Sequence, residues 1–149
     1  MRLTGFTDYT LRTLIYLALR PDRLSTIADI SKAYGISANH LMKVVHHLAV
    51  SGDIVTTRGR RGGMRLARPA SAINVGQVVR RTEPDMALVS CFDATQGCVI
   101  QDRCVLERVL REALAAFLAV LDRYTLADLI GPRQALAELL GVPPDALTT

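Results

Sequence analysis

The sequence predicts a mostly α-helical protein with a single β-hairpin, and three observations carry that prediction. Apolar residues recur every three or four positions over several stretches, as they do in helices with one buried face. Residues 54–66 instead contain two β-prone runs on either side of a glycine-rich turn. Aromatic residues make up only 5% of the chain and tryptophan is absent, so we expect slender helices packed through Leu, Ala and Val, in an oligomer.

The first expected helix starts at Thr7 or Asp8 and ends before Pro21, which cannot continue it. Its apolar positions fall on one face: Thr10, Leu11, Leu14, Ile15, Leu17 and Ala18. Asp8 would then lie in the first turn, where the helix dipole favours a carboxylate.

Two shorter helices follow. Thr26 and Asp29 have the spacing of a capping box at the start of the second helix, and Gly35 suits its C-terminal end. Ser37 is the expected cap of a third helix, which runs to about Ser51. The inward residues of this third helix are Leu41, Val44, Val45 and Leu48.

The β-hairpin comes directly after these helices. Residues 54–58 read as one strand, 59–63 as a turn rich in glycine and arginine, and 64–66 as the returning strand. Two short helices joined by a turn at 34–37 and followed by a hairpin have the order of a winged helix-turn-helix. Glycines let the hairpin tip approach a DNA backbone, and arginines can enter a minor groove.

A short helix is expected at Val75–Thr82, and a long one from Cys104 to about Asp122. The apolar positions of the long helix advance by three or four: Leu106, Leu110, Ala113, Leu114, Phe117, Leu121 and Tyr124. This stripe is longer than one small domain can cover, so we expect it to pair with a second subunit. A last helix is expected over Arg133–Leu140, after a turn capped by Thr125.

Charge divides the chain in two. Residues 1–81 contain 13 Lys and Arg against 4 Asp and Glu, for a net charge of +9. Residues 82–149 contain 5 and 10, for a net charge of −5. A strongly basic small domain indicates nucleic acid as its partner. We therefore expect a DNA-binding winged-helix domain over residues 1–81, and a cysteine loop with dimerisation helices over residues 82–149.

Other classes of protein are disfavoured. The longest apolar run, at 11–19, is short and includes Arg12, so no membrane span is expected. The N-terminus lacks the features of a signal peptide, which favours the cytoplasm. No phosphate-binding loop, nucleophile elbow or paired catalytic carboxylates are found, so we do not expect an enzyme.

All three cysteines fall within fourteen residues, at Cys91, Cys98 and Cys104. Three thiolates in one loop suit zinc, copper(I) or an iron–sulfur cluster. Zinc usually has four protein ligands and tighter spacing, a disulfide leaves one cysteine over, and buried apolar cysteines fit poorly with the polar residues Asp93, Gln96, Gly97 and Asp102. An iron–sulfur cluster is the leading interpretation.

Several segments together resemble one family, the dimeric winged-helix iron–sulfur repressors of bacteria. They are residues 1–4, 7–12, 40–45, 58–63, the three-cysteine loop and residues 124–129. The sequence is most similar to the nitric-oxide-sensing branch of that family. The resemblance implies a homodimer that binds a palindromic operator beneath its two wings and releases it when nitric oxide damages the cluster. It implies a [4Fe-4S] cluster in preference to a [2Fe-2S] cluster.

The resemblance also bears on the ligands of the cluster. Three cysteines leave one iron of a cubane without a protein ligand. In some nitric-oxide sensors an acidic residue near the start of the first helix of the other subunit supplies it, and Asp8 matches that position. Glu107 stands where the assembly-regulating branch has a histidine, which disfavours that branch. Glu107, water and an exogenous thiol remain alternatives, and Asp8 has an alternative role as a residue that favours a helix N-terminus.

The residues expected to contact DNA are exposed polar and basic side chains of the first helix, the third helix and the hairpin: Arg12, Asn39, His40, Lys43, Arg58, Arg60 and Arg61. Asn39 and His40 lie near a helix N-terminus, where they can reach base edges, and Lys43 suits phosphate or guanine. A regulator that senses iron or cluster status is the main alternative function. An electron-transfer protein is less favoured, because it has no use for a basic wing.

Overall fold

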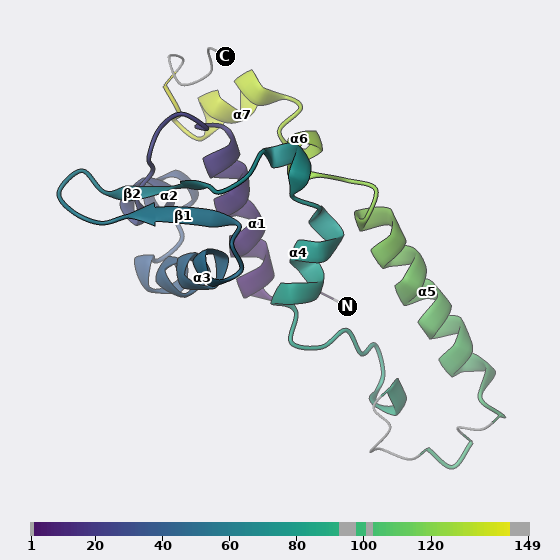
Figure 1. Cartoon of the computed structure of the whole chain (residues 1–149). Helices are drawn as coiled ribbons and strands as arrows, with labels where there is room; N and C mark the ends of the chain where they lie inside the picture. The colour runs from purple at the N-terminus through teal and green to yellow at the C-terminus, as the bar shows by residue number, and fades with distance from the viewer. Residues whose placement is uncertain (1, 93–97, 101–102, 144–149) are drawn as a thin grey trace.

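The computed structural model describes residues 2–92, 98–100 and 103–143. Its head consists of three helices and the hairpin, and one long helix extends away from it (Figure 1). The head contains α1 (Gly5–Ala18), α2 (Ile27–Tyr34) and α3 (Ala38–Val50). The predicted winged helix-turn-helix with a long additional helix is therefore confirmed.

Helix α1 begins earlier than the sequence suggested. Thr4, and not Thr7 or Asp8, is its N-cap, and the Thr4 hydroxyl accepts the Thr7 N–H at 3.2 Å. Thr7 is fully buried inside the helix, where its hydroxyl oxygen lies 2.9 Å from that of Thr82. A polar residue at the expected helix start thus serves a buried contact between α1 and the rest of the chain.

Helices α2 and α3 begin where they were expected. Thr26 and Asp29 form the predicted capping box, and Gly35 ends α2 with a φ of 67°, a left-handed conformation that suits glycine. Ser37 caps α3 by accepting the His40 N–H. The turn between α2 and α3 is consequently as short as a helix-turn-helix requires.

The hairpin pairs β1 (Ile54–Thr57) with β2 (Gly63–Leu66) in antiparallel register, with Ile54 opposite Leu66. The start of β1 and Met64 of β2 are buried against the head. The turn between the strands extends beyond the head as a wing (Figure 1).

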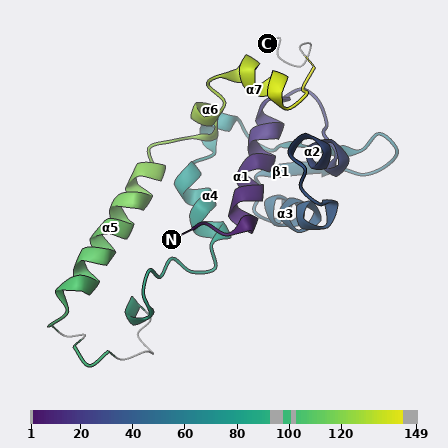
Figure 2. The same ribbon diagram turned by 180° about the vertical axis from the view of Figure 1, so that it is seen from behind.

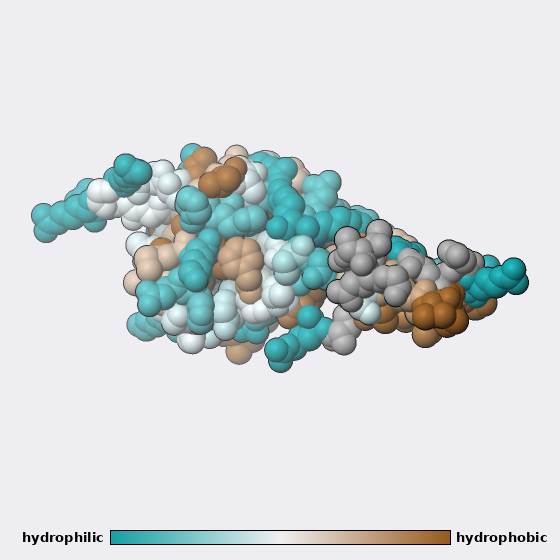
Figure 3. All heavy atoms as spheres, turned by 90° about the horizontal axis from the view of Figure 1, so that it is seen from below, coloured by the Kyte–Doolittle hydropathy of each residue, from teal (hydrophilic) through white to brown (hydrophobic). Residues whose placement is uncertain are grey.

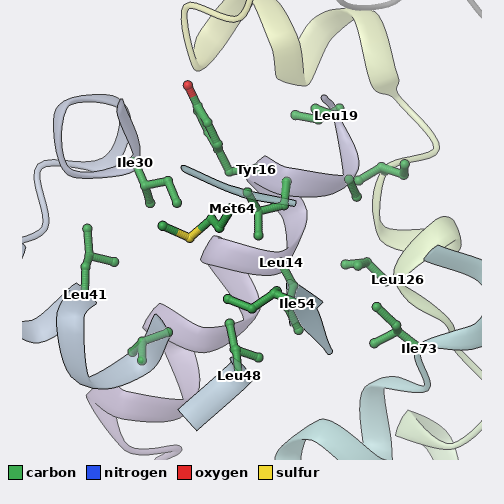
Figure 4. Close-up of a cluster of buried hydrophobic side chains, with 14 of the residues drawn as sticks. Leu14, Tyr16, Leu19, Ile30, Leu41, Leu48, Ile54, Met64, Ile73 and Leu126 are labelled. Carbon is green, nitrogen blue, oxygen red and sulfur yellow. The ribbon is translucent and has the colours of Figure 1, made fainter. Parts of the chain in front are cut away.

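The remaining elements are η1 (Ala70–Ala72), α4 (Val75–Thr82), η2 (Ser90–Phe92), α5 (Val105–Leu121), α6 (Leu126–Leu129) and α7 (Arg133–Leu139). Helix α4 lies between α1 and α5 (Figure 2). Beyond α5 the chain returns to the head, where α6 and α7 pack beside the end of α1. Leu126 of α6 joins Leu14, Ile54 and Ile73 in the same hydrophobic core (Figure 4).

Helix α5 is the exception to this packing. None of its 17 residues, all of which the structure describes, is buried. Apolar surface gathers toward the end of the molecule from which α5 starts (Figure 3). No helix in the described part of the chain is long and apolar enough to cross a membrane.

Candidate cysteine site and nucleic-acid interface

The three cysteines lie at the far end of the molecule from the wing, in the connection between η2 and α5. Cys91 is part of η2, Cys98 is exposed in the loop, and Cys104 is the N-cap of α5. The Cys104 Sγ accepts the Glu107 N–H at 3.4 Å, which places it against the positive end of the helix dipole. All three thiols are free, so the donor set is chemically suited to a soft metal or an iron–sulfur cluster.

The single chain does not bring these thiols into one metal-binding group. Among the described residues, no three His, Cys, Asp or Glu side chains converge closely enough to hold a metal ion. The loop residues Asp93, Gln96, Gly97 and Asp102 lie outside the described residues. Joint ligation by the three cysteines therefore stays a prediction.

Arg111, which the sequence analysis did not single out, connects the two ends of this cysteine loop. Its guanidinium lies 4.4 Å from the centre of the Phe92 ring, a cation–π contact. It also pairs with Glu107 at 2.8 Å, one turn earlier on α5. The residue next to Cys91 is thus held against the helix that Cys104 begins. The spacing of Glu107 and Arg111 was the available signal, because charges four residues apart meet on a helix.

The two acidic candidates for a fourth ligand are both paired in this structure. Asp8 accepts the Arg12 Nε–H at 3.0 Å and is about half exposed. Glu107 is 15% exposed and bound to Arg111. Asp8 is the more accessible carboxylate, and its partner is a residue that was independently expected to contact DNA.

A further carboxylate, Glu83, holds the start of α1. Its Oε1 accepts the Thr4 N–H at 2.8 Å and the hydroxyls of Thr4 and Thr7. A cavity of about 310 Å³ lies beside it, lined by residues of both chain segments and by Phe117 of α5. Glu83 joins the first turn of α1 to the segment that leads toward Cys91, a contact between distant parts of the sequence that no local pattern signals.

The expected base-reading residues lie at the N-terminal end of α3. Asn39, His40 and Lys43 are all exposed. The His40 ring accepts or donates a hydrogen bond at 3.1 Å with Ser37, and lies 5.7 Å from the Tyr9 ring of α1. These contacts fix the imidazole at the entrance to the recognition helix, where side chains of this kind reach base edges.

One histidine of the same helix is placed differently. The His47 ring packs edge-on against Phe6 of α1, with ring centres 5.4 Å apart. The contact half-buries His47 against α1. Asn39, His40 and Lys43, by contrast, are exposed in the first two turns of α3.

The wing arginines Arg58, Arg60 and Arg61 are exposed around the hairpin turn. Gly59 has a φ of 111°, which only glycine adopts without strain, and a Cβ at Gly62 would meet the backbone oxygen of Thr57. The turn is therefore tight and presents three guanidinium groups. Arg12 of α1 lies 5.8 Å from the Tyr34 ring centre.

Comparison with known proteins agrees with this arrangement. Residues 3–132 match the model of the Rrf2 family, described as iron-dependent transcriptional regulators. The HTH-type transcriptional regulator NsrR of Bacillus subtilis is 52% identical over 142 residues, which cover 94% of this chain and 97% of that protein. NsrR of Halalkalibacterium halodurans is 47% identical over 146 residues, with 97% and 100% covered.

Solved structures show the same fold. The oxidized form of CymR from Staphylococcus aureus aligns with a TM-score of 0.71 at 23% identity, covering 88% of this chain and 97% of that one. IscR of T. potens aligns with a TM-score of 0.69 at 23% identity, covering 87% and 86%. The structure contains a helix-turn-helix followed by a wing, and residues 3–132 match a family of transcriptional regulators and not of enzymes. The chain belongs to the Rrf2 family of DNA-binding transcriptional regulators.

Proposed function

We propose that this chain is a homodimeric, cytoplasmic repressor that senses nitric oxide through an iron–sulfur cluster. Residues 1–81 bind a palindromic operator, and residues 82–149 hold the cluster and the dimer interface. Cys91, Cys98 and Cys104 are the cysteine ligands, and a [4Fe-4S] cluster is favoured over [2Fe-2S]. Asp8 of the second copy is the fourth ligand.

One observation carries the proposal: three free thiols occupy a connection that lies outside the hydrophobic core, at the start of the helix whose apolar face is open. A second chain packed along α5 would bring its own α1 toward this connection. The similarity to NsrR proteins at about half identity supports an iron–sulfur cluster at this position. The iron atoms of such a cluster supply the binding site for nitric oxide.

The residues of this chain then divide the work. The thiolates bind iron, and the dipole of α5 stabilises negative charge beside Cys104. Arg12 occupies one oxygen of the Asp8 carboxylate, Oδ1, so a metal would bind the other oxygen or displace Arg12. A metal on Asp8 would weaken the Asp8–Arg12 ion pair and leave Arg12 better able to contact a DNA phosphate, which would couple the ligand site to the operator.

The decisive experiment uses full-length protein purified without oxygen and a DNA fragment that this protein selects from a random library. Absorbance of the cluster and fluorescence anisotropy of the labelled DNA are followed while nitric oxide is added. We expect the chromophore and the DNA complex to decline together. Each single Cys→Ala variant should lack the chromophore, because the described loop offers no other soft ligand. DNA binding that ignores nitric oxide would refute the proposal.

The role of Asp8 is tested separately. Asp8→Ala should still assemble a cluster on three cysteines, bind the operator more weakly and respond differently to nitric oxide. Glu112→Ala removes an exposed carboxylate from α5 without disturbing a helix cap and serves as the control. Equal operator affinities and equal nitric oxide titrations for Asp8→Ala and wild type would leave Asp8 as a helix-start residue.

A regulator that senses iron or cluster status is the second candidate, favoured by the description of the family as iron-dependent. Iron chelation distinguishes the two. An iron sensor changes its DNA affinity when a chelator is added in the absence of nitric oxide. A nitric-oxide sensor with a firmly held cluster does not.

A further inference from the structure

Two neighbouring arginines of α4 connect opposite sides of the molecule. Arg80 and Arg81 are consecutive, so their side chains leave the helix roughly 100° apart. Arg80 reaches the end of α5, and Arg81 reaches the base of the wing. Helix α4 lies between these two structures (Figure 1).

The contact with α5 is closely fitted. Both guanidinium nitrogens of Arg80 bind the Asp122 carboxylate, at 2.5 and 2.7 Å. The Asn74 side chain donates to the Asp122 backbone oxygen at 2.7 Å, which ties the start of α4 to the same residue. A Cβ on Gly76 would collide with the Asp122 carboxylate. The C-terminal end of α5 therefore cannot shift without disturbing α4.

The contact with the wing centres on Asp53, whose side chain is completely buried just before β1. Arg81 binds its Oδ2 at 2.6 Å, and Arg68, which follows β2, binds its Oδ1 at 2.5 Å. The Asp53 backbone oxygen also accepts the Ala67 N–H at 2.9 Å. Asp53 thus closes the hairpin at its base and presents one oxygen to α4.

Asp53 is fully buried between Arg68 and Arg81, and removing one cation from a buried ion pair is costly, so Asp53 resists separation from Arg81. A movement of α4 is consequently passed to the base of the hairpin. We propose that Arg80 and Arg81 form a link through which the position of α5 sets the orientation of the wing on DNA. Arg80, Arg81 and Asp53 are positioning residues in this link, which rests on the proposed function for its signal but not for its geometry.

The test exchanges charges at the exposed half of the link. Arg80 and Asp122 are each about 40% exposed, so Arg80→Glu, Asp122→Arg and the double variant should all fold. Arg123→Glu makes the same charge change beside Asp122 at a residue without an ion pair in the described part of the chain, and is the control. Arg81→Met tests the buried half.

The first measurement is amide hydrogen exchange of β1 and β2 in cluster-free protein. Arg80→Glu should accelerate exchange in the hairpin by about fivefold, the scale of an exposed ion pair, and leave α2 unchanged. Arg81→Met should accelerate it further. The double variant should regain the wild-type rate, and Arg123→Glu should keep it. Wild-type exchange in both single arginine variants would overturn the link.

The second measurement is the ratio of DNA affinities before and after nitric oxide, on cluster-loaded protein. Arg80→Glu should reduce this ratio about fivefold and the double variant should restore it. If nitric oxide does not change the DNA affinity of wild type, the nitric oxide function is refuted. The link is then tested by the hydrogen exchange measurement alone. A normal ratio in wild type and in Arg80→Glu alike would overturn the link while the proposed function stands.

Discussion

Helices α1 and α5 have similar apolar periodicity and opposite environments. In α1, Leu14, Leu17 and neighbouring residues are buried by α3, α4 and α6 of the same chain. In α5, Leu106 is 63% exposed and Val109 50% exposed. A spacing of three and four residues therefore identifies the apolar face of a helix, but it does not identify the surface that covers this face.

The two helices also differ in how they are held. The first turn of α1 is tied by Glu83 and its body is surrounded by core. Helix α5 is tied at its C-terminal end, through Asp122. The head is packed within one chain, and the open face of α5 is where the proposed second copy would pack.

The largest expected effect separates these two helices. Leu14→Ala should lower the free energy of unfolding by about 2–5 kcal/mol, because it opens a cavity in a fully buried site. Leu106→Ala should change the unfolding of the monomer by less than about 0.5 kcal/mol. Urea denaturation measures both.

The two variants should differ in the opposite direction when self-association is measured, because Leu106 and not Leu14 is exposed. Leu106→Ala should weaken self-association, so its thermal midpoint should lie below that of wild type at concentrations where wild type associates, and the two midpoints should converge on dilution. Sedimentation equilibrium checks this directly. Unfolding losses of equal size in Leu14→Ala and Leu106→Ala, independent of concentration, would contradict the division between the two helices.

Gly76→Ala should break the anchor of α5 without touching α1. The new Cβ displaces the Asp122 carboxylate and so disturbs its ion pair with Arg80, which should lower the thermal midpoint. Gln77→Ala, at the next and exposed position, should be neutral. Thermal unfolding of both variants provides the measurement, and a neutral Gly76→Ala would mean that the joint is loose.

Substitutions in the wing should change the salt dependence of DNA binding and leave the free energy of unfolding unchanged. Arg60→Ala with Arg61→Ala should flatten the plot of log affinity against log salt by about 0.9 for each phosphate contact removed. Unfolding should be unaffected, because both side chains are exposed. A salt slope equal to that of wild type would remove the wing from the DNA interface.

The effect confined to the narrowest range of conditions concerns alkaline pH. Burial raises the pKa of Tyr34 to about 12, above its ordinary value of about 10. The unfolded chain then loses the phenol proton first, so stability is complete below about pH 10 and falls as pH rises toward 12. Tyr34→Phe should lack this decline in urea denaturation at increasing pH. A parallel decline in both proteins would assign it to other groups.

Much of the fold could be predicted from local chemistry. Caps such as Thr26 and Ser37, the glycine stop at Gly35 and the hairpin turn are decided by neighbouring residues, so the sequence places them well. The start of α1 could not be placed in this way. Thr4 and not Thr7 is the N-cap because Glu83, 79 residues further along the chain, accepts the Thr4 N–H and holds Thr4 at the helix start.

The candidate site could be predicted only as a set of residue types. Cysteine spacing indicates soft-ligand chemistry, but the contact of Arg111 with Phe92 joins residues on either side of the loop and has no local signature. The same holds for Asp53, whose cations come from Arg68 and Arg81. Pairings across the fold depend on tertiary approach, which no single window of sequence contains.

The attachment of α5 at one end makes it a lever. Its 17 residues span roughly 25 Å, so a rotation of about 5° at Asp122 corresponds to a movement of about 2 Å at Cys104. A displacement at Cys104 consequently becomes a small rotation of α5 about Asp122. Because the helix is long, a weak force at Cys104 produces a stronger force on α4. Such a rotation is transmitted only if the contacts around Asp122 are rigid. The ion pairs of the adjacent residues Arg80 and Arg81 of α4 provide this rigidity.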